Sequence, residues 1–133
     1  MIYLEVLGRP VVWKAPRVTR RGTFSEHTQK KIEAQWQLKA QYQADPLEGD
    51  LSITFKFLFT PPRGLSQKKH LELIDTGFNK RPDISNLEKF ACDCGNGILW
   101  LDDKQIIKMT AEKIYATKEK TIIIIEPYLD DEL

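Results

Sequence analysis

Three carboxylates in the second half of the 133-residue chain have the types and spacing of a metal site. Asp83 lies at the start of an expected helix, and Asp102–Asp103 lies in an expected turn after that helix. If the three side chains meet, their charges raise one another's pKa unless a cation compensates. Mg²⁺ prefers such oxygen ligands. The alternative is structural, because aspartate commonly caps helices and Asp-Asp is ordinary in turns. On the pattern alone, this alternative is the commoner explanation.

A second set of polar residues follows Asp83 on the same helix. Asn86, Lys89 and Asp93 lie three and then four residues apart, so they share one side of the helix. In a site they place an amide, an ammonium and a carboxylate beside the acidic residues. On a solvated surface they form only a Lys89–Asp93 pair, worth a few tenths of a kcal/mol. We favour function for Lys89 and leave Asn86 and Asp93 open.

Basic residues gather near the N-terminus and just before Asp83, although the net charge is only +1. The segment KAPRVTRRG contains no acid, whereas acidic residues concentrate in the last third of the chain. Such cations bind DNA phosphates with salt-dependent affinity, and a surface loop of mixed purpose explains any single one about as well. The candidate DNA-binding residues are Lys14, Arg17, Arg20, Arg21, Lys80 and Arg81.

The length suits one domain, residues 1–133, with one hydrophobic core. Apolar periodicity predicts an α+β fold in which two main helices pack on a mostly antiparallel or mixed sheet. The expected elements are a strand over 2–7, a helix from Ser25 toward Pro46, a strand over 51–59, a short helix over 66–74 capped by Ser66, a helix from 83–85 to 95–97, and a β-hairpin over 105–126.

The aromatic residues favour a core over a binding surface. Phe55, Phe57 and Phe59 fall on one face of the expected strand with Leu51 and Ile53, which predicts a core or dimer face rather than a base-stacking surface. In the first helix, the spacing of Ile32, Trp36 and Ala40 predicts the buried stripe. Trp13 either stacks on an opened base or lies in the core, and we favour the core.

Composition excludes several classes of protein. The apolar fraction of 41% and charged fraction of 29% are typical of a soluble globular chain, and no apolar run can span a bilayer. We therefore expect no membrane partner. The N-terminus lacks the pattern of a signal peptide, which predicts a cytoplasmic protein. Cys92 and Cys94, two apart in a helix, suit neither a disulfide nor a shared metal, and His27 and His70 are expected at the surface.

Residues 81–107 resemble the signature of the RusA family of Holliday-junction resolvases. The motif stands here as Pro82-Asp83-Ile84-Ser85-Asn86-Leu87, followed by Lys89, Asp93 and the run Trp100-Leu101-Asp102-Asp103-Lys104-Gln105-Ile106. The early basic loop, first helix, aromatic strand before Pro-Pro and terminal hairpin agree with the family in order only. No single piece is specific, but the ordered set is.

The resemblance implies a homodimer that binds four-way DNA junctions in recombination and repair. With Mg²⁺, for which Mn²⁺ should substitute, such a dimer nicks two strands symmetrically. Asp83 and Asp103 are then the essential metal-binding carboxylates, with Asp102 beside them and Lys89 near the scissile phosphate. Ser85, Asn86 and Asp93 would support that site from its surroundings.

One residue departs from the family pattern. Ser85 stands where the family usually has a second aspartate, and a hydroxyl is a poorer Mg²⁺ ligand than a carboxylate. With Glu88 it is expected to form a capping box at the helix start. Two alternatives follow. The first is a junction-binding protein with weak or lost cleavage. The second is a small α+β interaction domain whose acidic residues are only caps and turns.

Overall fold

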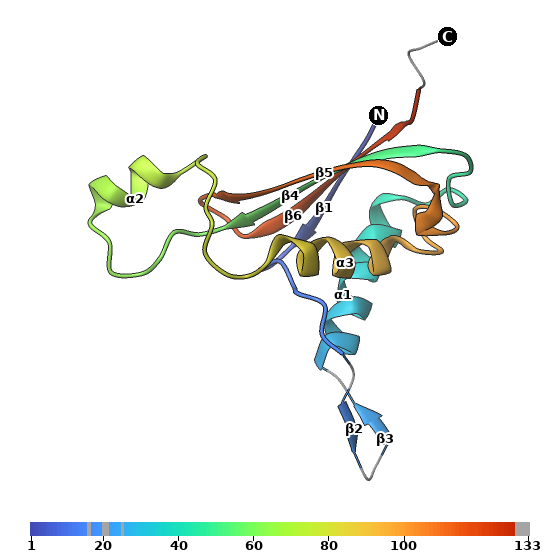
Figure 1. The fold of residues 1–133 in the computed structure, drawn as a ribbon, viewed down its shortest axis with the longest axis horizontal. Helices are drawn as coiled ribbons and strands as arrows, with labels where there is room; N and C mark the ends of the chain where they lie inside the picture. The colour runs from blue at the N-terminus through green and yellow to red at the C-terminus, as the bar shows by residue number, and fades with distance from the viewer. Residues whose placement is uncertain (16, 20–21, 25, 130–133) are drawn as a thin grey trace.

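The structure is a computed structural model that describes residues 1–15, 17–19, 22–24 and 26–129. The chain has an α+β fold with a four-stranded mixed sheet, a separate two-stranded hairpin and three α-helices (Figure 1). Its elements are β1 (Ile2–Leu7), β2 (Arg17–Thr19), β3 (Gly22–Phe24), α1 (Glu26–Gln41), β4 (Leu51–Phe59), α2 (Gln67–Leu73), α3 (Ile84–Gly95), the 3₁₀ turn η1 (Asp103–Gln105), β5 (Ile106–Tyr115) and β6 (Lys120–Pro127).

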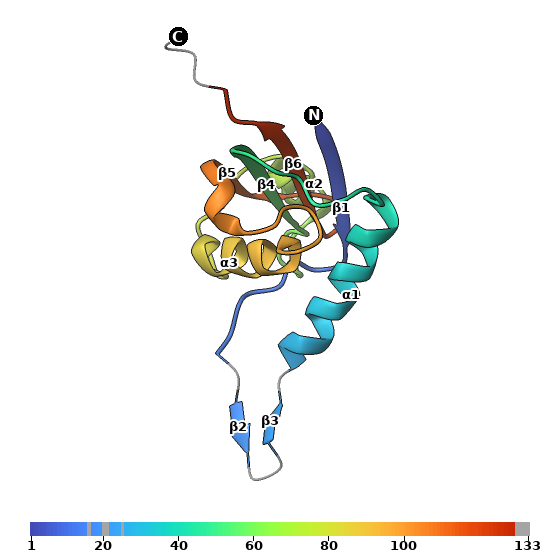
Figure 2. The ribbon, with the colours of Figure 1, turned by 90° about the vertical axis from the view of Figure 1, so that its right-hand side faces the viewer.

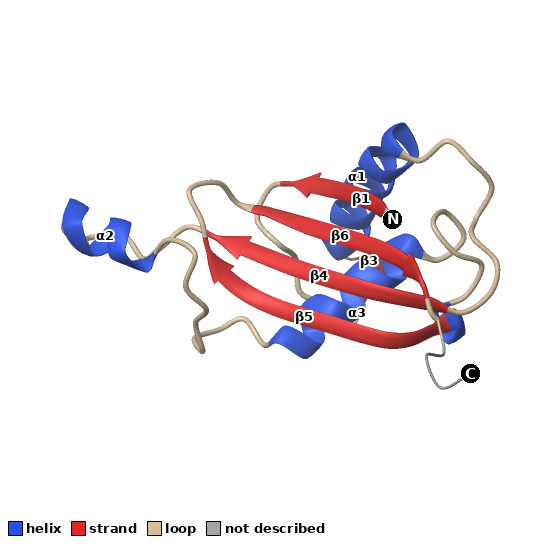
Figure 3. Ribbon diagram, turned by 90° about the horizontal axis from the view of Figure 1, so that it is seen from above, coloured by secondary structure: helices blue, strands red, loops and turns tan. Residues whose placement is uncertain are grey.

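The four-stranded sheet has the order β1-β6-β4-β5. β6 is antiparallel to both of its neighbours, and β5 runs parallel to β4. Both α1 and α3 lie on one face of this sheet, as Figures 2 and 3 show from two directions. The β2–β3 hairpin projects beyond the helices, and α2 lies beyond one end of the sheet (Figure 1). The expected hairpin over 105–126 is wrong, because β4 lies between β5 and β6.

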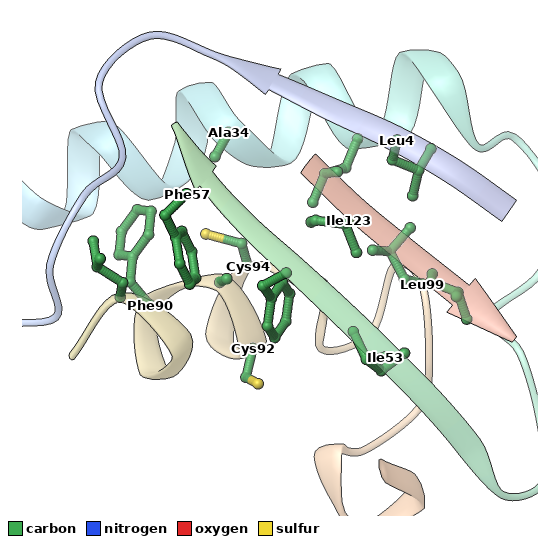
Figure 4. Packing of buried hydrophobic residues seen from close by; sticks show 14 of the residues in the cluster. Leu4, Ala34, Ile53, Phe57, Phe90, Cys92, Cys94, Leu99 and Ile123 are labelled. Carbon is green, nitrogen blue, oxygen red and sulfur yellow. The ribbon is translucent and has the colours of Figure 1, made fainter. Parts of the chain in front are cut away.

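The core fills the space between the sheet and the two long helices (Figure 4). β4 alternates strictly between buried and half-buried residues, as its sequence predicts. Phe55 and Phe57 are almost completely inaccessible, and their rings stack on each other 5.7 Å apart. The strand's aromatic face is therefore core. It is not a surface left over for a dimer contact.

Helix α1 buries a different side from the one expected. Ile32, Trp36 and Ala40 are exposed, and Trp36 retains 71% of its accessible surface. Ala34 and Leu38 are buried instead, at the same four-residue spacing. Apolar periodicity alone could not separate these two stripes.

Two glutamines bind α1 to β1 in this orientation. Gln41 accepts a hydrogen bond from the backbone N–H of Glu5 (2.9 Å) and donates one to the Glu5 carbonyl (2.6 Å). Gln37 makes the same pair of bonds with Leu7, at 2.7 and 3.5 Å. These bonds dock α1 alongside β1. They also satisfy backbone groups of β1 that no neighbouring strand pairs.

The other helices agree better with expectation. In α3, Leu87, Phe90, Ala91 and Cys94 have the 3, 4, 7 spacing that predicts a buried helix face, and all four are buried; Cys92 is buried too. Ser66 caps α2 by accepting a hydrogen bond from the Lys69 N–H, and α2 buries none of its residues. The expected Ser25 cap of α1 lies outside the described residues. Within the described part of the chain, no helix is long and apolar enough to cross a membrane.

Candidate active site around helix α3

Asp83 occupies the position immediately before α3. It is the N-cap residue of the helix, but its exposed side chain makes no cap hydrogen bond. Because the helix begins at Ile84, Ser85 is its second residue, and the capping box expected from Ser85 and Glu88 is wrong. The Asp83 carboxylate is therefore available to a ligand and is not used by the helix backbone.

A lysine on β5 holds the segment that leads into Asp83. The Nζ atom of Lys113 donates hydrogen bonds to the carbonyls of Lys80 (2.6 Å) and Pro82 (3.0 Å), on either side of the cis Arg81–Pro82 peptide. The same ammonium lies 5.0 Å from the ring centroid of Phe78. Sequence reasoning missed Lys113. The feature that could have indicated it is a lysine on the face of β5 that points toward the helices, where it pairs across the strands with Phe57.

The acidic turn, residues 101–105, is fixed by one glutamine. The side-chain oxygen of Gln105 accepts hydrogen bonds from the N–H groups of Leu101 (2.8 Å) and Asp102 (3.0 Å). Its amide nitrogen donates to the carbonyls of Leu47 and Gly49, both at 2.9 Å. Gln105 thus forms a capping box with Asp102 and ties the acidic turn to the loop before β4.

The two aspartates of the acidic turn differ in their bonding. Asp102 Oδ1 accepts a hydrogen bond from the Lys104 N–H at 2.8 Å, and this bond is the main reason why the pKa of Asp102 lies below its ordinary value. Asp103 begins η1, and its side chain is exposed. Asp102 therefore helps to shape the acidic turn, while Asp103 presents a carboxylate to solvent.

A buried tryptophan lies directly before the acidic turn and packs against the end of α3. Trp100 is completely inaccessible, and its Nε1 donates a 2.7 Å hydrogen bond to Asn96 Oδ1. Its ring packs against Gly95 so closely that a Cβ atom at Gly95 would lie 2.4 Å from it. The end of α3 and the acidic turn are consequently locked together, since close-packed interiors leave no slack there.

One side of α3 carries acidic residues toward the acidic turn. Burial raises the pKa of the Cys92 thiol to about 12, and the next two causes are the negative charges of Asp103 and Glu88. Both carboxylates therefore lie within electrostatic range of this sulfur. Burial also raises the pKa of Glu88 itself. Sequence reasoning gave Glu88 no role beyond a cap, because nothing in its spacing distinguishes it from a solvated glutamate.

The other side of α3 faces the N-terminal arm, residues 8–15. Lys89 Nζ lies 3.5 Å from the ring centroid of Trp13, and the backbone N–H of Trp13 donates a 3.0 Å hydrogen bond to the Asn86 carbonyl. Asp93 lies close enough to His27 to oppose the lowering of that imidazole's pKa, which comes chiefly from burial. In the described residues the ion pairs are Arg9–Glu119 and Lys120–Glu5, so the Lys89–Asp93 pair of the solvated-surface alternative does not form.

Two of the residues in this region were expected elsewhere. Trp13 is half-buried against the edge of the core, neither a fully buried core residue nor a free stacking surface. His27 is half-buried rather than a surface histidine, and its ring meets those of Trp13 and Phe90 edge-on.

The described candidate DNA-binding residues occupy three places. Lys14 is exposed on the N-terminal arm, next to an open cavity of about 730 Å³ between this arm and α1. Lys80 and Arg81 are exposed just before Asp83. Arg17 belongs to β2 in the projecting hairpin, whereas Arg20 and Arg21 lie outside the described residues.

The structure does not gather the predicted metal ligands into one group. In the described ranges of the chain, no three His, Cys, Asp or Glu side chains are placed so that they could hold a metal ion. Asp102 and Asp103 are neighbours, whereas Asp83 precedes the first turn of α3. Proteins often bind Mg²⁺ through one or two carboxylates together with substrate phosphates. This donor set fits Mg²⁺ in that form only, and its assignment to a metal stays a prediction.

The sequence matches the family Endodeoxyribonuclease RusA over residues 8–126. No curated protein matches it. The family match begins at the N-terminal arm, includes α3 and the acidic turn, and ends within β6. It therefore extends well beyond residues 81–107, the segment that carries the resemblance. By this match the chain belongs to the RusA family of endodeoxyribonucleases.

Proposed function

We propose that this chain is a Mg²⁺-dependent endodeoxyribonuclease that resolves four-way DNA junctions by paired, symmetric nicks. The family match over residues 8–126 carries the proposal, because RusA proteins are nucleases of Holliday junctions. The site supports it. Three exposed side chains stand on or beside α3: Asp83, which makes no cap hydrogen bond, Lys89 and Asp103.

The roles of the residues follow from their chemistry. Asp83 and Asp103 would hold Mg²⁺ together with phosphate oxygens, with Asp102 beside them, and Mn²⁺ should substitute. When bound, such an ion supplies an acidified water and neutralises charge on the departing oxygen. Lys89 contributes a positive charge that stabilises the developing charge of the phosphoryl group. Exposed Lys14, Lys80 and Arg81 bind backbone phosphates without reading the sequence.

The working form in this proposal is a homodimer. A four-way junction has approximate two-fold symmetry, and a C₂ dimer presents two identical sites to two strands of equal polarity. The helices cover only one face of the sheet (Figures 2 and 3). The open face includes the half-buried Leu58, Ile114 and Ile124, which are apolar side chains suited to such a contact.

A second candidate is a junction-binding protein with weak or lost cleavage. Two observations favour it. Ser85 supplies no charge at the second position of α3, and no three potential metal ligands gather among the described residues. Neither observation weakens DNA binding, since the exposed cations do not depend on the metal.

The deciding experiment incubates a labelled four-way junction with the full chain, with and without Mg²⁺. The proposal expects two symmetric nicks with Mg²⁺ and none without it. A linear duplex of the same sequence is the control and should survive. Binding without nicks in either Mg²⁺ or Mn²⁺ would favour the second candidate, and a failure to bind the junction at all would contradict both.

A further inference from the structure

The N-terminal arm reaches α3 at one tryptophan. The backbone N–H of Trp13 donates a 3.0 Å hydrogen bond to the carbonyl of Asn86, and Lys89 lies three residues further along the same helix. The Lys89 Nζ atom stands over the Trp13 ring, 3.5 Å from its centroid. The arm therefore contacts α3 through its backbone at one point and receives the lysine on its ring face one turn later.

The indole ring also contacts a histidine of α1, which packs in turn on α3. His27 on α1 meets it edge-on, with centroids 6.5 Å apart and an interplanar angle of 84°. His27 in turn packs edge-on against Phe90 at 5.0 Å, and Phe90 belongs to the buried side of α3. The arm, α1 and α3 thus all contribute to the orientation of this ring.

A lysine at this position would otherwise be poorly ordered. Lys89 is exposed, makes no ion pair among the described residues, and has four rotatable bonds in its stem. A tryptophan face is the most favourable aromatic partner for an ammonium ion. The ring restricts the ammonium to one side of α3, and the exposed Lys14 follows Trp13 directly in the sequence.

We propose that Trp13 is a positioning residue, whose indole face holds the Lys89 ammonium where the arm brings DNA to α3. The inference rests on the proposed nuclease function, because it gives the lysine its place in that reaction. Trp13 does not touch the reacting phosphate. It acts by reducing the freedom that Lys89 must lose when it meets the developing charge.

A double-mutant cycle separates this role from a general structural one. Single-turnover cleavage of a four-way junction at saturating protein is compared for the wild type, Trp13→Leu, Lys89→Met and the double variant. Loss of an exposed cation–π contact predicts a rate about two- to fivefold lower for Trp13→Leu. In the Lys89→Met background, Trp13→Leu should have no further effect, because the partner it positions is absent.

The outcomes distinguish the inference from the proposed function. No cleavage by the wild type contradicts the proposed function. Cleavage by the wild type with an unchanged rate for Trp13→Leu contradicts the inference alone, and so does an equal drop in both backgrounds. Trp13→Phe keeps a ring face and should retain most of the rate. If Trp13→Leu does not fold, Trp13→Phe takes its place in the cycle, with a smaller expected effect.

A second measurement needs no cleavage. Protons above an indole face are shifted upfield by its ring current, so the ε-methylene protons of Lys89 should resonate upfield of the other lysines in a spectrum of ¹³C-lysine-labelled protein. Lys89→Met assigns the signal, and Trp13→Leu should return it to the ordinary range. An ordinary shift in the wild type would overturn the inference whatever the cleavage assay shows.

Discussion

The acidic turn and the N-terminal arm both reach α3, but they are held with very different firmness. The side chain of Gln105 holds the acidic turn through four hydrogen bonds, two accepted and two donated, and the buried Trp100 directly precedes the turn. The arm is tied to α3 by one backbone bond and one lysine–tryptophan contact. Asp102 and Asp103, two of the carboxylates proposed for chemistry, therefore have stiff support, as a preorganised site requires. Lys14, the candidate DNA-binding cation on the arm, has lighter support at α3, which suits a contact that needs only to attract a flexible backbone.

The largest effect should come from the acidic turn. Asp103→Asn keeps the shape of the side chain but removes its charge, so junction cleavage should fall by orders of magnitude. Binding should survive or tighten, because repulsion of phosphate decreases. Cleavage gels and fluorescence anisotropy measure the two effects. Asp45→Asn, at an exposed site before β4, is the matched control. Equal cleavage by Asp103→Asn and the wild type would remove Asp103 from the site.

The support beneath the acidic turn should be intolerant of added volume. Gly95→Ala places a Cβ 2.4 Å from the Trp100 ring, and overpacking of this kind typically destabilises a protein by about 1–3 kcal/mol. Urea unfolding measures the change. Gly77→Ala is the control, because its new Cβ would lie an ordinary 3.5 Å from the Lys113 carbonyl. Similar stabilities for the two variants would show that the end of α3 can relax away from Trp100.

On the arm and the β2–β3 hairpin that follows it, replacing cations should act through salt dependence. Lys14→Ala with Arg17→Ala removes two candidate phosphate contacts, so the slope of log affinity against log salt should fall by about two. The measurement is junction binding between low and moderate salt. Lys39→Ala with Lys118→Ala removes the same charge from exposed sites elsewhere and should leave the slope unchanged. If both pairs behave alike, DNA does not run along the arm.

Restoring the missing carboxylate tests how the start of α3 contributes. Ser85→Asp adds a hard oxygen ligand two residues after Asp83, so a titration of cleavage against Mn²⁺ should shift to lower metal concentration. Ser85→Asn has the same size without the charge and should not shift it. No shift with Ser85→Asp, or a loss of activity, would mean that this chain builds its site without that carboxylate.

The smallest effect concerns the position of Asp103 relative to α3. The pKa of Cys92 is about 12, so its thiol stays protonated at neutral pH, and Asp103 contributes to that rise after burial. Removing the Asp103 charge should lower the thiol pKa, because a nearby negative charge disfavours the thiolate. Thiolate absorbance during an alkaline titration measures this shift. Asp45→Asn should produce none, and a shift no larger for Asp103→Asn would place its carboxylate away from Cys92.

The parts of the fold that could be predicted are those with a strong periodic signal. The alternation in β4 and the 3, 4, 7 spacing in α3 identified both elements and their buried sides. In α1 two stripes had the same spacing, and the choice between them depended on glutamine bonds to β1 that no sequence pattern reveals. The prediction of which strands pair was wrong for a similar reason. Because β5 and β6 are consecutive in sequence and joined by a short loop, they resemble a hairpin, but in the sheet β4 lies between them.

The candidate site shows the same division between local and distant contacts. The acidic turn and the start of α3 were found from sequence, because aspartates and a glycine turn leave local signatures. The residues that hold them were not found. Lys113 reaches the Lys80 and Pro82 carbonyls from a strand 31 residues later than Pro82, and Trp13 reaches Lys89 from the far end of the chain. Such partners depend on tertiary packing, which spacing along one segment cannot encode.

The glutamine bonds between α1 and β1 constrain how two copies of this chain can associate. A sheet whose outer strand has unpaired backbone groups can add a strand from another molecule. Here Gln37 and Gln41 occupy those groups at Leu7 and Glu5. At the opposite margin, Asp75, Thr76 and Phe78 bond to the backbone of Lys113 and Tyr115 on β5. A continuous sheet through two protomers would have to break these bonds. A contact through the face of the sheet would leave all of these bonds and the strand register undisturbed.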